Sequence, residues 1–597
     1  MQRFFARFTN LCLTTLLLGA LCPLLKAQQS NELLPLDQVH AGMQGYAYTV
    51  FSGDQVEKFD LEVLGVMPNF LGPKQSIILV ELKGPKVEHT GVVAGMSGSP
   101  VYLDGKLAGA LSLKLGIFTK EAIAGVTPIQ DMLHPPAQNS VAQGSTPQQF
   151  RLPNDAIAQN TLPNGSSLQP IETPLVFSGF QQSTLQQFAS QLQSFGLVAA
   201  PGGTDPDQKD DPHAHLSPGD MAGMVLVRGD MSINAACTVT AVTQDQVFLC
   251  GHPFLNLGDI QMPMARSVVV TTLSSSLAST KIVNTGGMIG TITSDHLTAV
   301  TGKLGAPPPM IPLDLTFVIG SDEKKLHFEM INHPKLTPLL VAMTTFNSVT
   351  QNSLYGEGTT LHLTGEIQLK GHLPVKIENT FAPQDSLLPD GLPIALTVQT
   401  VFGRLFTNNF EVPNVEHVSL KVESLPGRNS YSIDSAWLET GEAMPGEDLK
   451  VRVQLRPYRG EPRIEETTVH VPDQIARGTT LRVLVTDADW MNRASHGFSF
   501  GATPGTASGP AGLDQLVSLI NHERHNDRLY VGLFVPAPMM VWDDKEMPNI
   551  PLSAISIIDG RPSPGSVQVL RESLASESSV ALGAPVSGLI SLNLQIR

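Results

Sequence analysis

The chain has 597 residues, several times the size of an ordinary domain, so roughly three to five domains are expected. Hydrophobic residues make up 42% and charged residues only 15%, with 52 glycines and 45 prolines, which is typical of a β-rich protein with many turns. The formal net charge is −16, and no basic run follows the first few residues. This charge argues against nucleic acid or an anionic membrane surface as the main partner.

The N-terminus, 1–27, has the pattern of a secretory signal. Two arginines precede an apolar stretch from Leu11 to Leu25, and a small-residue exit follows at Ala27. We therefore expect export to the periplasm or the exterior of a bacterial cell envelope. No later segment reaches the ~18 unbroken apolar residues of a membrane span, so none is expected after the signal is removed.

Two β lobes are predicted beyond the signal. Short strand-like runs with turn signals, such as Asp104-Gly105, predict the first lobe over 28–135. Pro, Gln, Asn and Ser then dominate 136–219, which predicts a linker with one short helix. The β pattern returns over 220–348, which predicts the second lobe.

The C-terminal part of the sequence predicts three further regions. A β connector is expected over 349–389, and alternating strands over 390–490 fit the spacing of an immunoglobulin-like sandwich. An α/β region with one helix is expected over 491–597. The predicted fold class is therefore mainly β, with a C-terminal α/β region.

A serine surrounded by small residues lies between two strands of the first lobe, in the stretch Gly95-Met96-Ser97-Gly98-Ser99-Pro100. A nucleophile for acyl transfer needs such a glycine-permitted backbone, because its hydroxyl must stand clear while nearby N–H groups converge on the developing oxyanion. Chymotrypsin-like peptidases have the form Gly-x-Ser-Gly-x-Pro here, and their oxyanion hole uses the N–H groups that correspond to Gly95 and Ser97. The alternative is a tight structural turn.

A histidine in an equally unusual setting lies in the second lobe, in Cys250-Gly251-His252-Pro253. His252 ends a strand between glycine and proline, where the backbone is held and the ring could face a cleft. It is the candidate base.

These stretches resemble the SpoIVB-type serine peptidases, the sporulation stage IV protein B family of the chymotrypsin-like clan. The segment 90–110 is similar to the nucleophile segment of that family, and 51–63 to the strand pair before it. The run 238–242 with Gly251-His252 is similar to the family's Gly-His stretch after a hairpin.

The resemblance implies a two-lobed chymotrypsin-like β-barrel endopeptidase acting on a protein or peptide, with Ser97 as nucleophile and His252 as general base. No cofactor and no metal are expected, and the sequence does not indicate the oligomeric state. In the family the histidine half comes first, so here the halves are in reversed, permuted order. A catalytic site is defined by the geometry of its residues and not by their order along the chain, so the permutation alone does not forbid catalysis.

The acid of the site is not evident. The family's proposed acid lies in an Asp-Pro step ahead of the serine motif, and the matching step here is Gly84-Pro85. Asp259 is the preferred candidate to orient His252, Asp230 is its rival and Asp220 is a weaker third, although each is also a typical turn residue. A Ser-His dyad, or a catalytically inactive binding or structural protein of the envelope, is the alternative.

Cys237 and Cys250 flank a predicted hairpin and are the cysteines that remain after the signal is removed. A two-residue turn at Thr243-Gln244 would place them opposite each other, within reach of a disulfide. A turn at Gln244-Asp245 would instead place Cys237 opposite His252. The alternative to a bridge is a pair of small buried residues.

Overall fold

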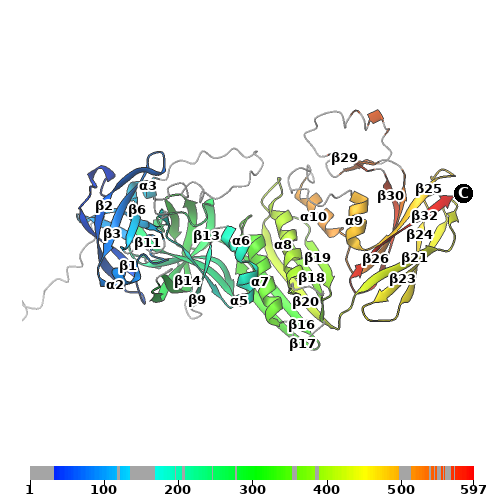
Figure 1. Cartoon of the computed structure of the whole chain (residues 1–597), viewed down its shortest axis with the longest axis horizontal. Coiled ribbons are helices and arrows are strands. Elements are labelled where there is room, and N and C mark those ends of the chain that lie inside the picture. The colour runs from blue at the N-terminus through cyan, green and yellow to red at the C-terminus, as the bar shows by residue number, and fades with distance from the viewer. Residues whose placement is uncertain are drawn as a thin grey trace, which may run out of the picture.

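The computed structural model describes residues 32–597 apart from 117–120, 135–167, 195–196, 205–208, 245, 276–278, 353–358, 384–388, 497–511, 537–538, 543–544, 548–550, 552, 555–556, 558–566 and 571. The predicted secretory signal, 1–27, lies outside the described residues. Within the described ranges, no helix is long and apolar enough to cross a membrane. Figure 1 shows two barrels, a central sheet with helices and a C-terminal sandwich arranged in a row.

The first barrel closes from six antiparallel strands. Their pairing order is β1-β2-β3-β6-β5-β4, and β4 pairs back with β1. Apolar side chains such as Leu61, Val80 and Leu103 fill the interior because alternate residues of each strand point inward. The elements are η1 (Leu36–Gln38), β1 (Gln44–Val50), β2 (Val56–Gly72), β3 (Gln75–Lys83), α2 (Pro85–Thr90), β4 (Pro100–Leu103), β5 (Lys106–Leu115), β6 (Ile123–Pro128) and α3 (Ile129–Leu133).

The second barrel repeats this arrangement. Its strands pair in the order β10-β11-β12-β15-β14-β13, and β13 pairs back with β10. Numbered within each barrel, both orders read 1-2-3-6-5-4. The strands are β10 (Met221–Gly229), β11 (Ser232–Thr243), β12 (Gln246–Leu249), β13 (Gly258–Leu273), β14 (Thr280–His296) and β15 (Ala299–Leu304). The mainly β, chymotrypsin-like barrel fold predicted from the sequence is confirmed.

The predicted linker, 136–219, requires correction over its second half. Residues 168–204 form short strands and helices that pack on the barrels, because buried Leu168, Ile171 and Leu175 lie among the polar residues that dominate the composition. The first part, 136–167, lies outside the described residues. The elements are β7 (Leu168–Pro170), β8 (Pro174–Ser178), α5 (Gln182–Gln187), α6 (Ala189–Ser194) and β9 (Val198–Thr204).

A central sheet continues from the second barrel through the pairing of β10 with β17. Its strands lie in the order β17-β16-β20-β18-β19, so the expected connector, 349–389, is an integral part of this sheet. Two adjacent helices, α7 and α8, pack against it and share the core that extends from the second barrel (Figure 1). The elements are β16 (Ile311–Ile319), β17 (Asp322–Met330), α7 (Thr337–Asn352), β18 (Thr359–Leu369), β19 (Val375–Phe381), α8 (Leu392–Phe406) and β20 (Val415–Pro426).

The immunoglobulin-like sandwich expected over 390–490 begins later than predicted. The run that reads as a strand after Leu392 is helix α8, because its buried residues Ile394, Val398 and Val401 recur at helical spacing over a segment too long for a typical strand. Strand β20 belongs to the central sheet.

The C-terminal sandwich is built from residues 431–596 and includes most of the region expected to be α/β. A sheet of order β24-β23-β21-β31 faces one of order β22-β32-β25-β26-β30 across a common apolar core. The elements are β21 (Tyr431–Leu438), β22 (Glu442–Ala443), β23 (Asp448–Pro457), β24 (Arg463–His470), β25 (Thr480–Thr486), α9 (Ala488–His496), α10 (Leu513–Asn521), β26 (Arg528–Val535), β27 (Met539–Trp542), β28 (Lys545–Met547), β29 (Val567–Leu570), β30 (Ser573–Ala581), β31 (Val586–Ser587) and β32 (Leu589–Ile596).

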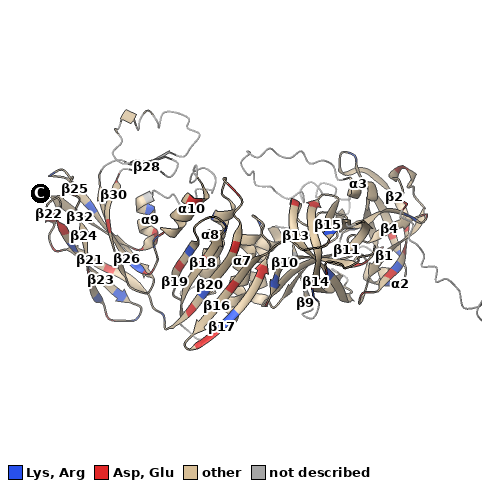
Figure 2. Ribbon diagram, turned by 180° about the vertical axis from the view of Figure 1, so that it is seen from behind, with Lys and Arg blue, Asp and Glu red and all other residues tan. Residues whose placement is uncertain are grey.

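Charge is distributed without a basic face on the side that Figure 2 shows. Acidic and basic residues are interspersed along the strands of the central sheet and the sandwich (Figure 2). Interspersed charges of both signs favour solubility and create no extended positive potential that would attract a polyanion such as nucleic acid.

Candidate active site

The two barrels pack directly against each other, and the candidate site lies at their junction. Tyr102 and Ile129 of the first barrel share an apolar cluster with Ala241 and Phe248 of the second. Hydroxyl groups add specific bonds across the junction, since the Oγ1 of Thr240 donates to the carbonyl of Gly98 at 2.7 Å. The two halves therefore close on each other, which a site made from both requires.

Ser97 lies in the connection between the third and fourth strands of the first barrel, in a turn that only glycines can form. Gly95 and Gly98 both have a φ of +92°, in the left-handed region. A Cβ on Gly98 would lie 2.0 Å from the carbonyl oxygen of Thr238 and 2.6 Å from the backbone nitrogen of Cys250. The turn thus lies directly against the second barrel, and the backbone N–H of Thr238 donates to the carbonyl of Ser97 at 2.8 Å.

His252 occupies the corresponding connection of the second barrel, between its third strand, β12, and its fourth, β13. The glycine before it packs on the first barrel, where the Oγ1 of Thr127 donates to the Gly251 carbonyl at 2.7 Å. The Nδ1 of His252 lies 2.8 Å from the carbonyl oxygen of Pro253. Because a carbonyl can only accept, Nδ1 carries the proton and Nε2 presents a free lone pair.

Burial lowers the pKa of His252, while the backbone of Pro253 and Ile171 and the charge of Glu172 act in the opposite direction. The ring is therefore neutral at neutral pH. Its Nε2 is buried and has no hydrogen-bond partner, so it does not bond to Ser97 in this structure. The Ser97 hydroxyl is fully buried and donates instead to the Sγ of Cys237 at 3.7 Å.

Residues 18–133 match the family described as SpoIVB peptidase S55. This match covers the serine half of the predicted peptidase unit and supports the SpoIVB-type family. Comparison with curated proteins finds no match. The matched residues include the strands of the first barrel, here named the SpoIVB-type barrel, and the Ser97 turn. The histidine half lies outside them, so the reversed order of the halves stays a prediction.

A disulfide joins Cys237 to Cys250 in the second barrel, beside the Ser97 turn of the SpoIVB-type barrel. The hairpin turn is the second alternative, over residues 244–245, because Thr243 pairs with Gln246. A β-bulge between Val239 and Ala241 then shifts the register by one residue. This irregularity allows the bridge, and the sequence alone did not indicate it.

The aspartates proposed as the acid contact groups other than the histidine ring. The Asp259 side chain is 97% exposed and lies 3.7 Å from the Nε2 of His296. Asp230 accepts the backbone N–H of His327 at 2.6 Å, and Asp220 accepts that of Ser217 at 2.7 Å. Among the described residues, none of these carboxylates bonds to His252. The Pro253 carbonyl takes the position on Nδ1 that a triad acid would occupy.

A buried carboxylate that the sequence analysis missed holds the histidine connection. Asp295, at the end of β14, is 1% exposed and accepts the backbone N–H groups of Phe254 at 2.7 Å, Leu255 at 2.8 Å and Leu257 at 3.1 Å. Burial raises its pKa, and the three donors oppose that effect. No motif marks Asp295, because its partners are backbone groups some forty residues away in sequence.

A second buried ionisable side chain, that of Lys281, lies beneath the Ser97 turn. Its Nζ donates to the Oγ1 of Thr49 at 2.7 Å and lies 3.5 Å from that of Thr238, and its side chain packs under Gly95. The Thr238 hydroxyl in turn donates to the Gly95 carbonyl at 2.9 Å. Burial lowers the pKa of Lys281 to about 7. The Gly95 peptide is therefore positioned from the second barrel.

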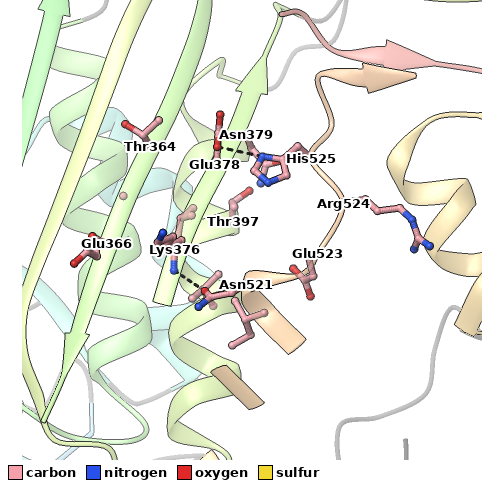
Figure 3. Close-up of a pocket in the computed structure, with 14 residues that line it drawn as sticks. Thr364, Glu366, Lys376, Glu378, Asn379, Thr397, Asn521, Glu523, Arg524 and His525 are labelled. Carbon is pink, nitrogen blue, oxygen red and sulfur yellow. Dashed lines mark hydrogen bonds and ion pairs between the residues drawn. The ribbon is translucent and has the colours of Figure 1, made fainter. Parts of the chain in front are cut away.

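A pocket of about 390 Å³ lies far from this site along the chain, between the β18–β19 hairpin, α8 and the segment after α10 (Figure 3). Several of its polar groups already have partners within the protein. His525 lies 3.3 Å from Glu378, and Asn521 accepts the backbone N–H of Lys376 (Figure 3). Arg524 points away from the pocket (Figure 3) and donates to Glu577. The pocket is a junction between the central sheet and the sandwich. Across the described residues, no group of three His, Cys, Asp or Glu side chains could hold a metal ion.

Proposed function

We propose that the two barrels form an exported serine endopeptidase in which Ser97 attacks a peptide carbonyl and His252 acts as general base. One observation carries the proposal. Two barrels of identical strand order present a serine and a neutral histidine from equivalent connections at their junction. Convergence of a nucleophile and a base from two lobes is the arrangement that defines the chymotrypsin-like site.

In this mechanism the Nε2 of His252 takes the proton of Ser97 as the hydroxyl oxygen bonds to the carbonyl carbon. The proton then passes to the leaving amine, and a water molecule repeats the sequence on the acyl-enzyme. The Pro253 carbonyl keeps Nδ1 protonated throughout, so the site works as a dyad. The N–H groups of Gly95 and Ser97 would hold the oxyanion.

The hydroxyl must turn from Cys237 toward His252 before it can react, since the two catalytic groups do not bond here. Catalytic hydrogen bonds are often long in the free enzyme and shorten when substrate binds. The same geometry favours the second candidate function, an inactive envelope protein that binds partners with a retained peptidase fold.

Export is supported by the N-terminal pattern and by the disulfide, because such bonds persist in oxidising compartments. N-terminal sequencing of the protein recovered from the periplasm or medium tests it. A mature terminus near Gln28 is expected, and a full-length chain retained in the cytoplasm would contradict export.

Labelling by a fluorophosphonate probe tests the chemistry. We expect the wild type to be labelled, Ser97→Ala to be unlabelled, and the matched variant Ser99→Ala, whose buried hydroxyl only donates to the Met96 carbonyl, to keep most of its labelling. The rate should fall at acidic pH as His252 is protonated, with its midpoint below the usual histidine pKa near 6.5 because burial lowers that pKa. A protein that is folded yet unlabelled at every pH would favour the inactive binding protein.

A further inference from the structure

A short segment between the two barrels lies across the candidate site. Residues 168–170 form strand β7, which pairs antiparallel with β5 through Pro170 opposite Leu113 and Leu168 opposite Leu115. The next residue continues the ladder, because the N–H of Ile171 donates to the carbonyl of Ser112 at 2.9 Å. Strand β4 pairs only with the first half of β5, so this edge would otherwise be open. The segment is thus an extended strand added to the SpoIVB-type barrel.

The same segment then passes the catalytic groups. The N–H of Gly95, one of the two predicted oxyanion donors, donates to the carbonyl of Glu172 at 3.1 Å. The Oγ1 of Thr173 lies 3.7 Å from the Sγ of Cys237, the same sulfur that the Ser97 hydroxyl contacts. The backbone of Ile171 lies beside the His252 ring. Residues 171–173 therefore lie, in turn, beside the candidate base, on the predicted oxyanion donor and beside the sulfur that the candidate nucleophile contacts.

Side chains anchor the segment on either side of that contact. Ile171 is fully buried in the core of the SpoIVB-type barrel, and Leu168 is nearly so. Glu172 forms an ion pair with Lys114 at 2.6 Å, while its other oxygen is buried without a hydrogen-bond partner. An ion pair of this partly exposed kind contributes little, about 0–1 kcal/mol, so strand pairing and the buried apolar side chains hold the segment.

We propose that residues 168–173 occupy the groove in which this protein binds an extended polypeptide, so that the structure is a self-occluded state. The proposal rests on the peptidase function above. A substrate takes the place of the segment, pairs antiparallel with residues 112–115 of β5 through its backbone, and places its scissile carbonyl on the Gly95 N–H. Backbone pairing supplies affinity for unfolded or extended chains, and side chains at alternate positions supply selectivity.

Weakening the pairing at one exposed position tests this. Ladder bonds alternate along an antiparallel pair, so the bond between Ile171 and Ser112 places Gln169 in a hydrogen-bonded pair with Lys114. Gln169→Pro removes that N–H, whereas Gln169→Ala keeps it. Both variants should fold, because Gln169 is exposed, and thermal unfolding checks this.

Two readouts separate the groove from the chemistry. A fluorescent peptide with the sequence of residues 168–172, Leu-Gln-Pro-Ile-Glu, should bind Gln169→Pro at least 10-fold more tightly than Gln169→Ala, measured by fluorescence polarisation. A peptide phosphonate of the same sequence should label Ser97 at least several-fold faster in the proline variant.

Equal peptide affinity in the two folded variants would overturn the self-occluded groove, whether or not Ser97 reacts. Tighter binding by Gln169→Pro without any labelling of Ser97 would support the groove and overturn the peptidase function. The two failures are therefore distinguishable.

Discussion

The two barrels share a strand order but are stabilised by different chemistry at the equivalent connection. The SpoIVB-type barrel positions Ser97 with glycines at positive φ, and among its described residues no charged side chain is buried. The second barrel positions His252 with a disulfide and the buried carboxylate of Asp295, and it also carries the buried Lys281. Sensitivity to pH and to reduction should therefore arise in the second barrel, and sensitivity to side-chain volume in the first.

The largest effect is expected from Gly98→Ala. The new Cβ would meet backbone atoms of the second barrel at 2.0 Å, in addition to the strain of a positive φ. Gly105→Ala is the matched control, because its φ is +74° with nothing within 4 Å of the added Cβ. We expect Gly105→Ala to lose about 1–2 kcal/mol and Gly98→Ala more than about 4 kcal/mol, measured by denaturant unfolding. Equal losses would show that the barrels do not pack through this turn.

Lys281 should make stability depend on pH. Its folded pKa of about 7 lies below the unfolded value of 10.5, so the unfolded chain binds the proton more tightly, and stability rises between pH 7 and pH 10.5. Below pH 7 the cost of burying the charged Lys281 is fully present and lowers the free energy of unfolding by an amount on the order of 4–5 kcal/mol.

Lys281→Met should remove most of this penalty, flatten the pH profile and stabilise the protein at pH 6, after a loss of about 1 kcal/mol for the hydrogen bond to Thr49. Lys303→Met, at an exposed position of β15, is the control and should leave the profile unchanged. Thermal unfolding from pH 6 to pH 10 measures both, and an unchanged slope in Lys281→Met would contradict the assignment.

Asp295→Asn should destabilise the histidine connection. An amide has one acceptor oxygen where the carboxylate serves three N–H groups, so we expect a loss of about 3 kcal/mol. Asp259→Asn, at the neighbouring strand but 97% exposed, should change stability by less than about 0.5 kcal/mol. Faster hydrogen exchange at Phe254 and Leu255 in Asp295→Asn, and not in Asp259→Asn, would locate the effect in the connection.

The smallest effect is expected on turnover in Asp259→Asn and Asp230→Asn. Neither carboxylate bonds to the His252 ring, and the Pro253 carbonyl already selects its tautomer. Once peptide or probe turnover is established, both variants should stay within several-fold of the wild type. A loss of orders of magnitude in either one would identify that aspartate as the triad acid.

Local patterns were sufficient to predict several features of this molecule. Alternating apolar residues and turn signals predicted the barrel strands, because the period of a strand is visible in the sequence. Small residues around Ser97, and glycine and proline around His252, indicated unusual backbone, since only glycine adopts the required φ without strain. Helix α8 was missed because its threonines and valines favour strands, while its buried face follows a helical period.

The sequence by itself determined the barrel strands, the serine turn and the histidine connection, because these depend on residues close together along the chain. Tertiary structure decided what surrounds them. A bulge in β11 set the register of the disulfide, Asp295 reached the histidine connection across a sheet, and residues 168–173 reached the edge of β5 from a segment whose composition suggested a linker. Each of these contacts joins groups distant in sequence, and only the closure of the barrels brings such groups together.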